Sequence, residues 1–256
     1  MFNKKKILIG TRNFMEENKI SVELVDEKMV ELENQGKTVM IVAVGKKIIG
    51  IIAVADVLKE NSKEAVDMLH KMGKSVAIIT GDNKRVGQAI AKQLEVDYVI
   101  AEVLPQDKAQ IIKKLQNGEG IENLKFKIEN SHRRWVVAMV GDGINDAPAL
   151  AQANLGIALG SGTDVAMETG EIVLIKDDLR DVVRAMDISK YTLGKIKLGL
   201  FWAFFYNIIG IPIAAGVLFP FTHMLLSPAI AAGAMAFSSV SVVLNSLSMK
   251  WYKPTA

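Results

Sequence analysis

The sequence of 256 residues contains no cysteine, which excludes disulfide bonds and thiolate metal ligands throughout the chain. It also has no basic stripe interleaved with aromatic residues, and its net charge is only +3, so nucleic-acid binding is not expected. The basic N-terminus has no apolar segment of signal-peptide length, which argues against secretion.

Charged residues are missing from one long part of the chain. Residues 198–249 contain no Asp, Glu, Lys or Arg, although 23% of the whole sequence is charged. This stretch has room for two membrane helices of about 20 residues each. We expect a hairpin in the lipid bilayer that turns at Pro220, with its second helix beginning at Ser227-Pro228. A pair of buried core helices is the alternative.

The orientation of this hairpin is predicted from its flanking charges. Lysines lie shortly before residue 198 and shortly after residue 249, and the loop between the two helices has none. By the positive-inside rule, both ends and the soluble part lie in the cytoplasm of a multi-pass membrane protein. His223, in the opposite loop, is interpreted as an ordinary loop residue rather than a metal ligand.

The first 53 residues are predicted to be rich in β-structure. The expected elements are a strand at 6–9 closed by Gly10, a helix at 21–35, and strands at 38–44 and 47–54. The two longer strands are expected to form a hairpin around Gly45-Lys46. Ser21 is the expected N-cap of the helix, and Gly36 is expected to stop it.

Residues 54–190 alternate between short apolar runs and segments of helical periodicity. The expected strands are 76–79, 98–101, 135–140, 155–158 and 172–175, and the expected helices are 62–72, 84–94, 106–116 and 146–152. This alternation predicts an α/β fold with a doubly wound parallel sheet. Ser62 is expected to cap its helix. Residues 117–134 have no clear period and are interpreted as an inserted surface loop.

A motif at Val140–Leu150 (VGDGINDAPAL) lies where an apolar strand ends and a helix begins. Ligands bind at such strand ends in open parallel sheets. Gly141 and Gly143 permit a tight turn, while Asp142 and Asp146 offer two hard oxygen ligands of the kind that Mg²⁺ prefers. A simple Gly-Asp turn is the alternative, and the second aspartate fits it poorly.

Two further motifs complement this one. Thr80-Gly-Asp-Asn83 also follows a buried strand, so the hydroxyl and backbone N–H groups of Thr80 can hold a phosphoryl oxygen. Pro105-Gln-Asp-Lys108 brings a lysine near the start of a helix, where it can reach the same phosphate. Taken alone, Lys108 is better interpreted as a solvated surface lysine.

Together these motifs resemble the later phosphoryl-transfer motifs of the haloacid dehalogenase-like superfamily, and their wording resembles that of P-type ATPases. The resemblance covers nearly the whole chain outside 117–134, and residues 159–166 and the strand at 172 also match. It implies Mg²⁺ and ATP as cofactors. The implied roles are phosphoryl transfer for Thr80, Gly81, Asp82 and Lys108, Mg²⁺ binding for Asp142 and Asp146, and nucleotide contacts for Gly10, Gly141, Gly143 and Asn145.

The hairpin carries polar residues that are costly within a membrane and are therefore candidate sites. They read Tyr206-Asn207-(x)4-Pro212 and Met235-(x)2-Ser238-Ser239. Helix–helix hydrogen bonding and plain packing are the alternatives. A thioether suits Cu(I), and neither expected helix offers a carboxylate or histidine for a harder ion. The pattern is similar to that of Cu(I)-transporting P1B-type ATPases, which implies copper, with silver as its usual companion.

The sequence lacks the Asp-Lys-Thr-Gly motif on which this family is phosphorylated, and it lacks the Cys-Pro-Cys motif. Thr169-Gly-Glu171 spells an actuator motif of the family, but its position indicates coincidence. By resemblance we expect the C-terminal part of a pump: 1–53 from the nucleotide domain, 54–190 from the phosphorylation domain and 191–250 as the last two membrane helices.

Without the nucleophile, we expect the chain alone neither to hydrolyse ATP by the family mechanism nor to transport copper. A fragment of a pump is the leading interpretation. The alternatives are a membrane-anchored haloacid dehalogenase-like phosphatase and a non-catalytic half that pairs with a separately encoded N-terminal part.

Overall fold

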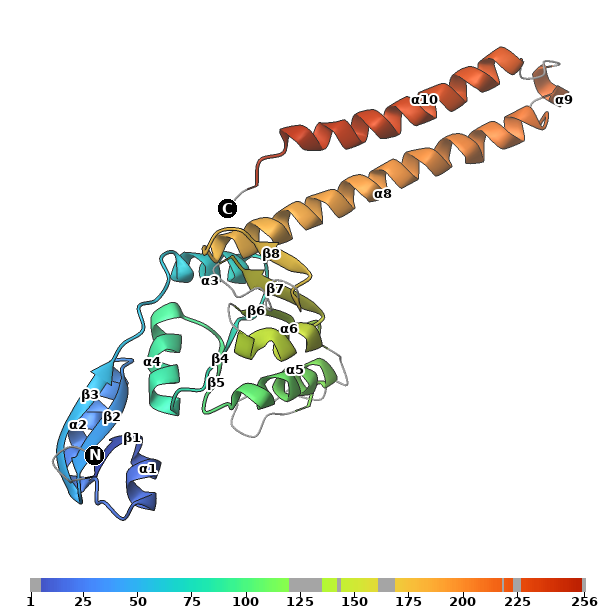
Figure 1. The fold of residues 1–256 in the computed structure, drawn as a ribbon. Coiled ribbons are helices and arrows are strands. Elements are labelled where there is room, and N and C mark those ends of the chain that lie inside the picture. The colour runs from blue at the N-terminus through green and yellow to red at the C-terminus, as the bar shows by residue number, and fades with distance from the viewer. Residues whose placement is uncertain are drawn as a thin grey trace. The chain divides into compact units, whose positions relative to one another are not determined.

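The computed structural model describes residues 6–119, 135–141, 144–160, 169–217, 219–222 and 227–254. Asp142, Gly143, His223 and most of the predicted insertion lie outside the described residues. The chain divides into two compact units, Met1–Val182 and Val183–Ala256, which we describe separately (Figure 1).

The first unit begins with an antiparallel sheet of order β1-β2-β3. Its elements are β1 (Ile7–Gly10), α1 (Arg12–Glu17), α2 (Glu23–Asn34), β2 (Thr38–Val44) and β3 (Lys47–Val54). The predicted hairpin is confirmed at both bounds. Every second residue of β2 is buried, as expected for a strand with one face toward a core. Met15 of α1, Met29 of α2 and Ile41 of β2 fill that core.

Two helix starts in this part differ from the prediction. Val22 rather than Ser21 occupies the N-cap of α2, and it makes no side-chain capping bond. Helix α1 was not predicted. Thr11 caps it by accepting a hydrogen bond from Phe14 N, and its six residues are too few to show a helical period.

The alternating part of the unit is α/β, as predicted. Its elements are α3 (Ser62–Lys71), β4 (Ala77–Ile79), α4 (Lys84–Leu94), β5 (Tyr98–Ile100), η1 (Pro105–Asp107), α5 (Lys108–Asn117), β6 (Ala138–Gly141), η2 (Ile144–Asp146), α6 (Ala147–Gln152), β7 (Leu155–Leu159) and β8 (Ile172–Leu174). Helix α4 has the predicted bounds. Ser62 does not cap α3, because Asn61 precedes it in left-handed conformation and Ser62 Oγ instead donates to Lys59 O.

Within the described ranges the parallel strands form two groups, whereas one doubly wound sheet was expected. Strand β4 pairs with β5, and β7 lies between β6 and β8. Helices α4 and α6 each connect neighbouring parallel strands. The longer connection from β5 to β6 joins strands that do not pair among the described residues. The motif that begins at Thr80 follows β4, the motif that contains Lys108 follows β5, and the motif that contains Asp146 follows β6.

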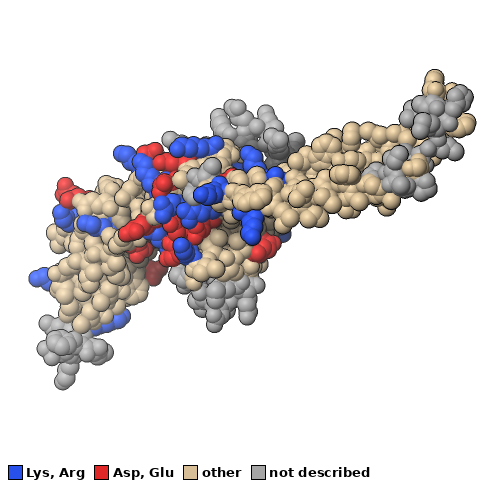
Figure 2. Space-filling model, turned by 90° about the horizontal axis from the view of Figure 1, so that it is seen from above, with Lys and Arg blue, Asp and Glu red and all other residues tan. Residues whose placement is uncertain are grey.

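The second unit contains α8 (Arg180–Ala214), α9 (Phe219–Thr222), α10 (Pro228–Leu247) and η3 (Ser248–Trp251). Among the described residues, α8 alone is long and apolar enough to cross a membrane by length and composition. In Figure 2 the described atoms of the charge-free part of the hairpin are tan, with no blue or red among them. The two long helices meet where Gly199 lies close to Asn245, whose Nδ2 donates to Lys195 O at 2.8 Å.

The expected start of the second helix at Ser227-Pro228 is confirmed, because α10 begins at Pro228. Helix α8 ends at Ala214 because Gly216 adopts a positive φ of 89°, and its N–H caps Ile213 O. Pro220 lies in the short helix α9, within the connection between α8 and α10 where the turn was predicted.

Candidate functional site

The turn after β4 holds Thr80, Gly81 and Asp82. Thr80 Oγ1 donates to Asp82 Oδ2 at 2.9 Å and accepts from Asp82 N at 3.1 Å. The backbone N–H of Thr80 donates to Ile100 O at 2.9 Å. That N–H is therefore already paired, and the hydroxyl is the Thr80 donor that can be redirected to a ligand. Thr38 Oγ1 also donates to Asp82 Oδ1 at 3.0 Å, which ties β2 to this turn.

Lys108 and Asp146 meet near the end of β6. Lys108 is the first residue of α5, Asp146 is the last of η2, and Lys108 Nζ donates to Asp146 Oδ1 at 2.6 Å. Their side chains are only 16% and 14% exposed. A charged hydrogen bond with this shelter is screened less by salt than a surface pair. Lys108 is therefore not a solvated surface lysine, although its sequence alone suggested one.

Gly141 is needed here for space rather than for turn geometry. A Cβ on this residue would lie 2.8 Å from Asp146 Cβ and 2.9 Å from Asp146 Oδ2. The φ of Gly141 is not positive, so a side chain would not be excluded by backbone strain. The missing side chain lets the Asp146 carboxylate come up against the strand end.

The predicted site residues form two groups. No hydrogen bond or ion pair joins Thr80 or Asp82 to the Lys108–Asp146 pair within the described ranges. The same part of the chain contains no group of three or more His, Cys, Asp or Glu side chains placed so that they could hold a metal ion. The second predicted Mg²⁺ ligand, Asp142, lies outside it.

Of the remaining predicted nucleotide contacts, Gly10 lies in the β1-β2-β3 sheet and Asn145 lies next to Asp146 in η2. Gly10 ends β1, pairs with Ile41, and leaves no room for a Cβ, which would lie 2.5 Å from the ring of Phe14. Asn145 is exposed in η2. Both positions are compatible with ligand contact.

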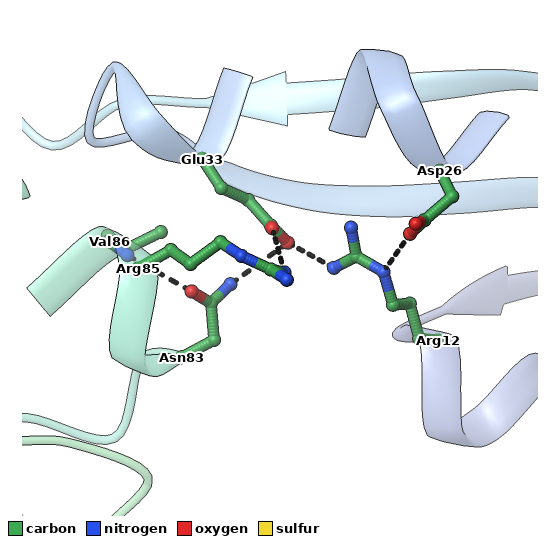
Figure 3. A network of polar contacts seen from close by, with 6 residues as sticks. All are labelled: Arg12, Asp26, Glu33, Asn83, Arg85 and Val86. Atoms are coloured by element: carbon green, nitrogen blue, oxygen red, sulfur yellow. Dashed lines mark hydrogen bonds and ion pairs between the residues drawn. The ribbon is translucent and has the colours of Figure 1, made fainter. Parts of the chain in front are cut away.

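A polar network that the sequence did not predict joins α2 to the turn after β4 (Figure 3). Glu33 on α2 is buried, with its side chain 1% exposed. Its Oε1 accepts from Arg12 Nη1 and from Asn83 Nδ2, and its Oε2 accepts from Arg85 Nη1. Asn83 Oδ1 in turn accepts from Val86 N at 3.0 Å and caps α4.

This network fixes charge as well as position. Burial lowers the pKa of the Arg12 guanidinium, but hydrogen bonds to Glu33 and Asp26 raise it more, so the pKa lies above its usual value and Arg12 stays cationic. One signal could have revealed Glu33. Met29 is an apolar residue of α2, and Glu33 lies four residues later on the same helix face, where both are buried.

Glu171, in the motif interpreted as coincidence, has a structural partner. Its Oε2 accepts a 2.7 Å hydrogen bond from Gly156 N on β7. The carboxylate thus satisfies a strand backbone group.

Two of the predicted copper ligands in the hairpin donate side-chain hydrogen bonds, and both bonds stay within one helix. Asn207 Nδ2 donates to Ala203 O at 2.8 Å, and Ser239 Oγ donates to Met235 O at 3.3 Å, each four residues back along its own helix. Met235 is 74% exposed. Ser238 is half-buried, as is Tyr206, whose ring centroid lies 5.9 Å from that of Trp202.

A family model described as haloacid dehalogenase-like hydrolase matches residues 2–154, more than half of the chain. The chain belongs to this family. Its described part contains two groups of parallel strands with polar motifs after their carboxyl ends.

The similarity to copper-transporting P-type ATPases extends over nearly the whole chain. A probable copper-exporting P-type ATPase of Archaeoglobus fulgidus is 52% identical over 97% of this chain, and a probable copper-importing P-type ATPase A of Enterococcus hirae is 48% identical over 94%. A zinc-transporting PIB-type ATPase structure in the E2.Pi state covers 97% of the chain with a TM-score of 0.69 and 31% identity. The chain spans only 29%, 30% and 36% of these proteins, respectively.

Proposed function

We propose that the chain supplies part of a copper(I)-transporting P-type ATPase: a half-site for phosphoryl transfer and a membrane hairpin with copper ligands. The observation that carries this proposal is the sheltered Lys108–Asp146 pair at the end of β6. It lies in a chain that is 52% identical to an archaeal protein named as a probable copper exporter.

The Asp146 carboxylate fits a magnesium site. It is a hard oxygen donor at a strand end, and the missing side chain of Gly141 lets it approach the strand backbone. We propose that Asp146 and Asp142 hold Mg²⁺, which when bound neutralises charge on phosphate oxygens. ATP is the proposed phosphate source in the complete pump, with Gly10, Gly141, Gly143 and Asn145 as its proposed contacts in this chain.

The other residues of the half-site can position a phosphate but cannot attack it. A lysine ammonium has three N–H groups, so Lys108 can hold Asp146 and still donate to a phosphate oxygen. The Thr80 hydroxyl, now bonded to Asp82, can donate to the same group after exchanging its acceptor. Because the sequence has no Asp-Lys-Thr-Gly motif, we propose that the nucleophile comes from a further part of the pump.

We propose that residues 191–250 form two membrane helices, with the soluble unit and both ends in the cytoplasm. The apolar length of α8 and the absence of charge between residues 198 and 249 support this topology. In this proposal residues 1–53 belong to the nucleotide domain and 54–190 to the phosphorylation domain. The proposed Cu⁺ ligands from the hairpin are Tyr206, Asn207, Met235, Ser238 and Ser239.

Magnesium binding to the whole detergent-solubilised chain tests the half-site. We expect Asp146→Asn to weaken Mg²⁺ affinity at least tenfold by titration calorimetry, because one of two charged ligands is lost. The matched control is Asp107→Asn, which changes a half-buried aspartate beside Lys108 that we assign no metal. Equal Mg²⁺ affinity in the wild type and Asp146→Asn would contradict the proposed site.

Copper binding tests the hairpin separately. We expect Met235→Leu to weaken Cu(I) affinity in a competition assay with a chromogenic chelator, since a soft sulfur ligand is replaced by an isosteric apolar group. Met249→Leu, outside the proposed ligands, is the control. An equal fall of copper affinity in both variants would contradict the assignment of Met235 as a copper ligand. Vanadate-sensitive, copper-stimulated ATP hydrolysis by the isolated chain would contradict the proposal that its phosphoryl-transfer site is incomplete.

A further inference from the structure

The second unit contains an open pocket of about 420 Å³ near the start of the charge-free stretch. Its lining residues are Asp187, Lys190, Tyr191, Gly194, Lys195, Leu198 and Tyr252. All except Tyr252 lie on α8 at spacings of three and four residues, so they share one side of that helix. The segment that follows α10 supplies Tyr252 as the opposite wall.

Aromatic stacking holds this wall in place. The rings of Tyr191 and Tyr252 are stacked, with centroids 3.8 Å apart and planes 10° from parallel. The Tyr252 hydroxyl donates to Asp187 Oδ2 at 2.8 Å, and this hydrogen bond raises the pKa of the tyrosine. The Asp187 carboxylate is thus hydrogen-bonded to Tyr252, which forms the opposite wall of the pocket.

Two lysines border the open part of the pocket. At about 100° per residue, Lys190 and Lys195 lie on opposite sides of Tyr191 around α8. Lys190 is exposed. Lys195 Nζ donates to Ser248 Oγ at 2.7 Å and lies 5.4 Å from the ring centre of Tyr191, which holds its ammonium at the pocket. A lysine has three N–H groups, so donors remain for a ligand.

The floor of the pocket is left open by a glycine. A Cβ built on Gly194 would meet no atom within 4 Å, and the φ of Gly194 is not positive. A larger side chain at this position therefore fits the backbone and occupies the pocket space. This gives a way to close the pocket without removing any of its charges.

The pocket lies at the level along α8 that a lipid headgroup would occupy in a bilayer. Lys195 precedes Leu198, the first residue of the charge-free stretch, by three residues, or about 4.5 Å along a helix. Lys190 lies about 12 Å before that residue. The headgroup layer on each side of a bilayer is about 5–8 Å thick. Lys195 thus falls within this layer, Lys190 just beyond it, and Leu198 begins the apolar surface.

We propose that this pocket binds the phosphate of an anionic phospholipid, with Lys190 and Lys195 on the phosphate and an acyl chain leaving along Leu198. Basic pockets between membrane helices on the cytoplasmic side bind such headgroups. Tyrosines belong at the same level, because their rings are apolar and their hydroxyls polar. The inference rests on the proposed membrane insertion of the hairpin.

The test uses the whole chain in detergent, titrated with fluorescent phosphatidylglycerol and with fluorescent phosphatidylcholine. We expect saturable binding of phosphatidylglycerol, at least tenfold tighter than of phosphatidylcholine. Lys190→Gln is expected to weaken it about fivefold, because one charged contact is lost. Gly194→Leu is expected to abolish it by filling the pocket.

Two matched variants separate the pocket from general surface charge. Lys197→Gln removes an exposed lysine of the same helix that does not line the pocket, and Gly210→Leu fills open space elsewhere on α8. Both are expected to change lipid affinity less than twofold. Equal losses in Lys190→Gln and Lys197→Gln, or unchanged affinity in Gly194→Leu, would overturn the proposal.

A further measurement distinguishes the source of the phosphate. We expect glycerol 3-phosphate at millimolar concentration not to displace the lipid, since it lacks the acyl chain. Full displacement would overturn the lipid assignment and indicate a soluble phosphorylated ligand. Alkaline extraction of vesicles reports insertion independently. A chain that is extracted refutes the membrane hairpin, whereas an inserted chain without lipid selectivity refutes the pocket alone.

Discussion

The phosphate motifs and the hairpin both carry polar side chains in sheltered or apolar surroundings, but they satisfy them differently. In the first unit, Lys108 bonds to a residue 38 positions later, and Glu33 to one 50 positions later. In the hairpin, Asn207 and Ser239 bond to carbonyls four residues back. Contacts between distant elements fix a geometry, whereas a bond within one helix can be exchanged for a ligand at small cost. The Lys108–Asp146 pair and the contacts of Glu33 are therefore arranged in advance.

The largest expected effect comes from breaking the longest-range contacts. Glu33→Ala should lower the free energy of unfolding of the first unit by about 3 kcal/mol, because it leaves Arg12 without its main counter-ion in a sheltered site. Hydrogen exchange at the start of α4 should also speed up, since Asn83 loses its support.

Glu31→Gln is the control for this change. It removes an exposed i,i+3 pair with Lys28 on the same helix and should cost less than about 0.5 kcal/mol. Similar losses in the two variants, measured by thermal unfolding in detergent, would mean that burial does not distinguish them.

Crowding Asp146 should have the next largest effect. Gly141→Ala places a Cβ within 3 Å of Asp146 and should cost about 2 kcal/mol through overpacking. It should also weaken Mg²⁺ binding, because the carboxylate must move. Gly50→Ala is the matched control, since a Cβ there meets nothing within 4 Å and its φ is not positive. A stable Gly141→Ala variant with native Mg²⁺ affinity would show that Asp146 has room to shift.

A smaller, pH-dependent effect is expected at Asp97. Burial raises the pKa of this carboxyl, but hydrogen bonds from Val76 N and His70 lower it more, so the net pKa lies below its usual value. A depressed pKa contributes stability that is full above about pH 4 and is lost as the pH falls through the folded pKa.

Asp97→Asn should therefore cost about 0.5–1 kcal/mol near pH 7, reduced by partial exposure, and progressively less below about pH 4. Unfolding midpoints measured from pH 7 down to pH 2.5 check this. A difference between wild type and variant that grows on acidification would have the wrong sign for a depressed pKa.

The smallest effect is expected in the hairpin. Ser239→Ala should change the stability of the membrane-inserted chain by about 0.5 kcal/mol or less, since it removes one local bond. Asn245→Ala should cost more, because Asn245 Nδ2 bridges α10 to α8. Steric-trap or denaturant unfolding in bicelles compares the two. If Ser239→Ala were the costlier change, the contrast between local and long-range bonds would fail.

Local pattern was enough to predict the elements that have a strong period. The 38–54 hairpin and α4 were predicted at their observed bounds, because two apolar runs around Gly45-Lys46 in one and a clear apolar face in the other are visible within a few residues. The short α1 has no such pattern. The strand ends that carry Thr80 and Asp146 were also predictable, since each follows an apolar run.

The partners of the site residues were not predictable in the same way. Glu33 looks like any charged helix residue until Arg12, Asn83 and Arg85 are placed around it, and these come from two distant parts of the sequence. Likewise, the need for Gly141 to be small depends on where Asp146 folds back. Tertiary distances decide such roles, and residue spacing does not contain them.

The bonds from Glu33 to Asn83 and Arg85 have a practical consequence for dissecting the chain. A polypeptide cut at Val54, between the β-rich part and the alternating part, would lose the carboxylate that holds the side chain capping α4. The same cut would remove Thr38 from Asp82. Shortened versions that keep residues 12–38 should retain the native turn after β4. In versions without these residues, the turn and the start of α4 should be less ordered.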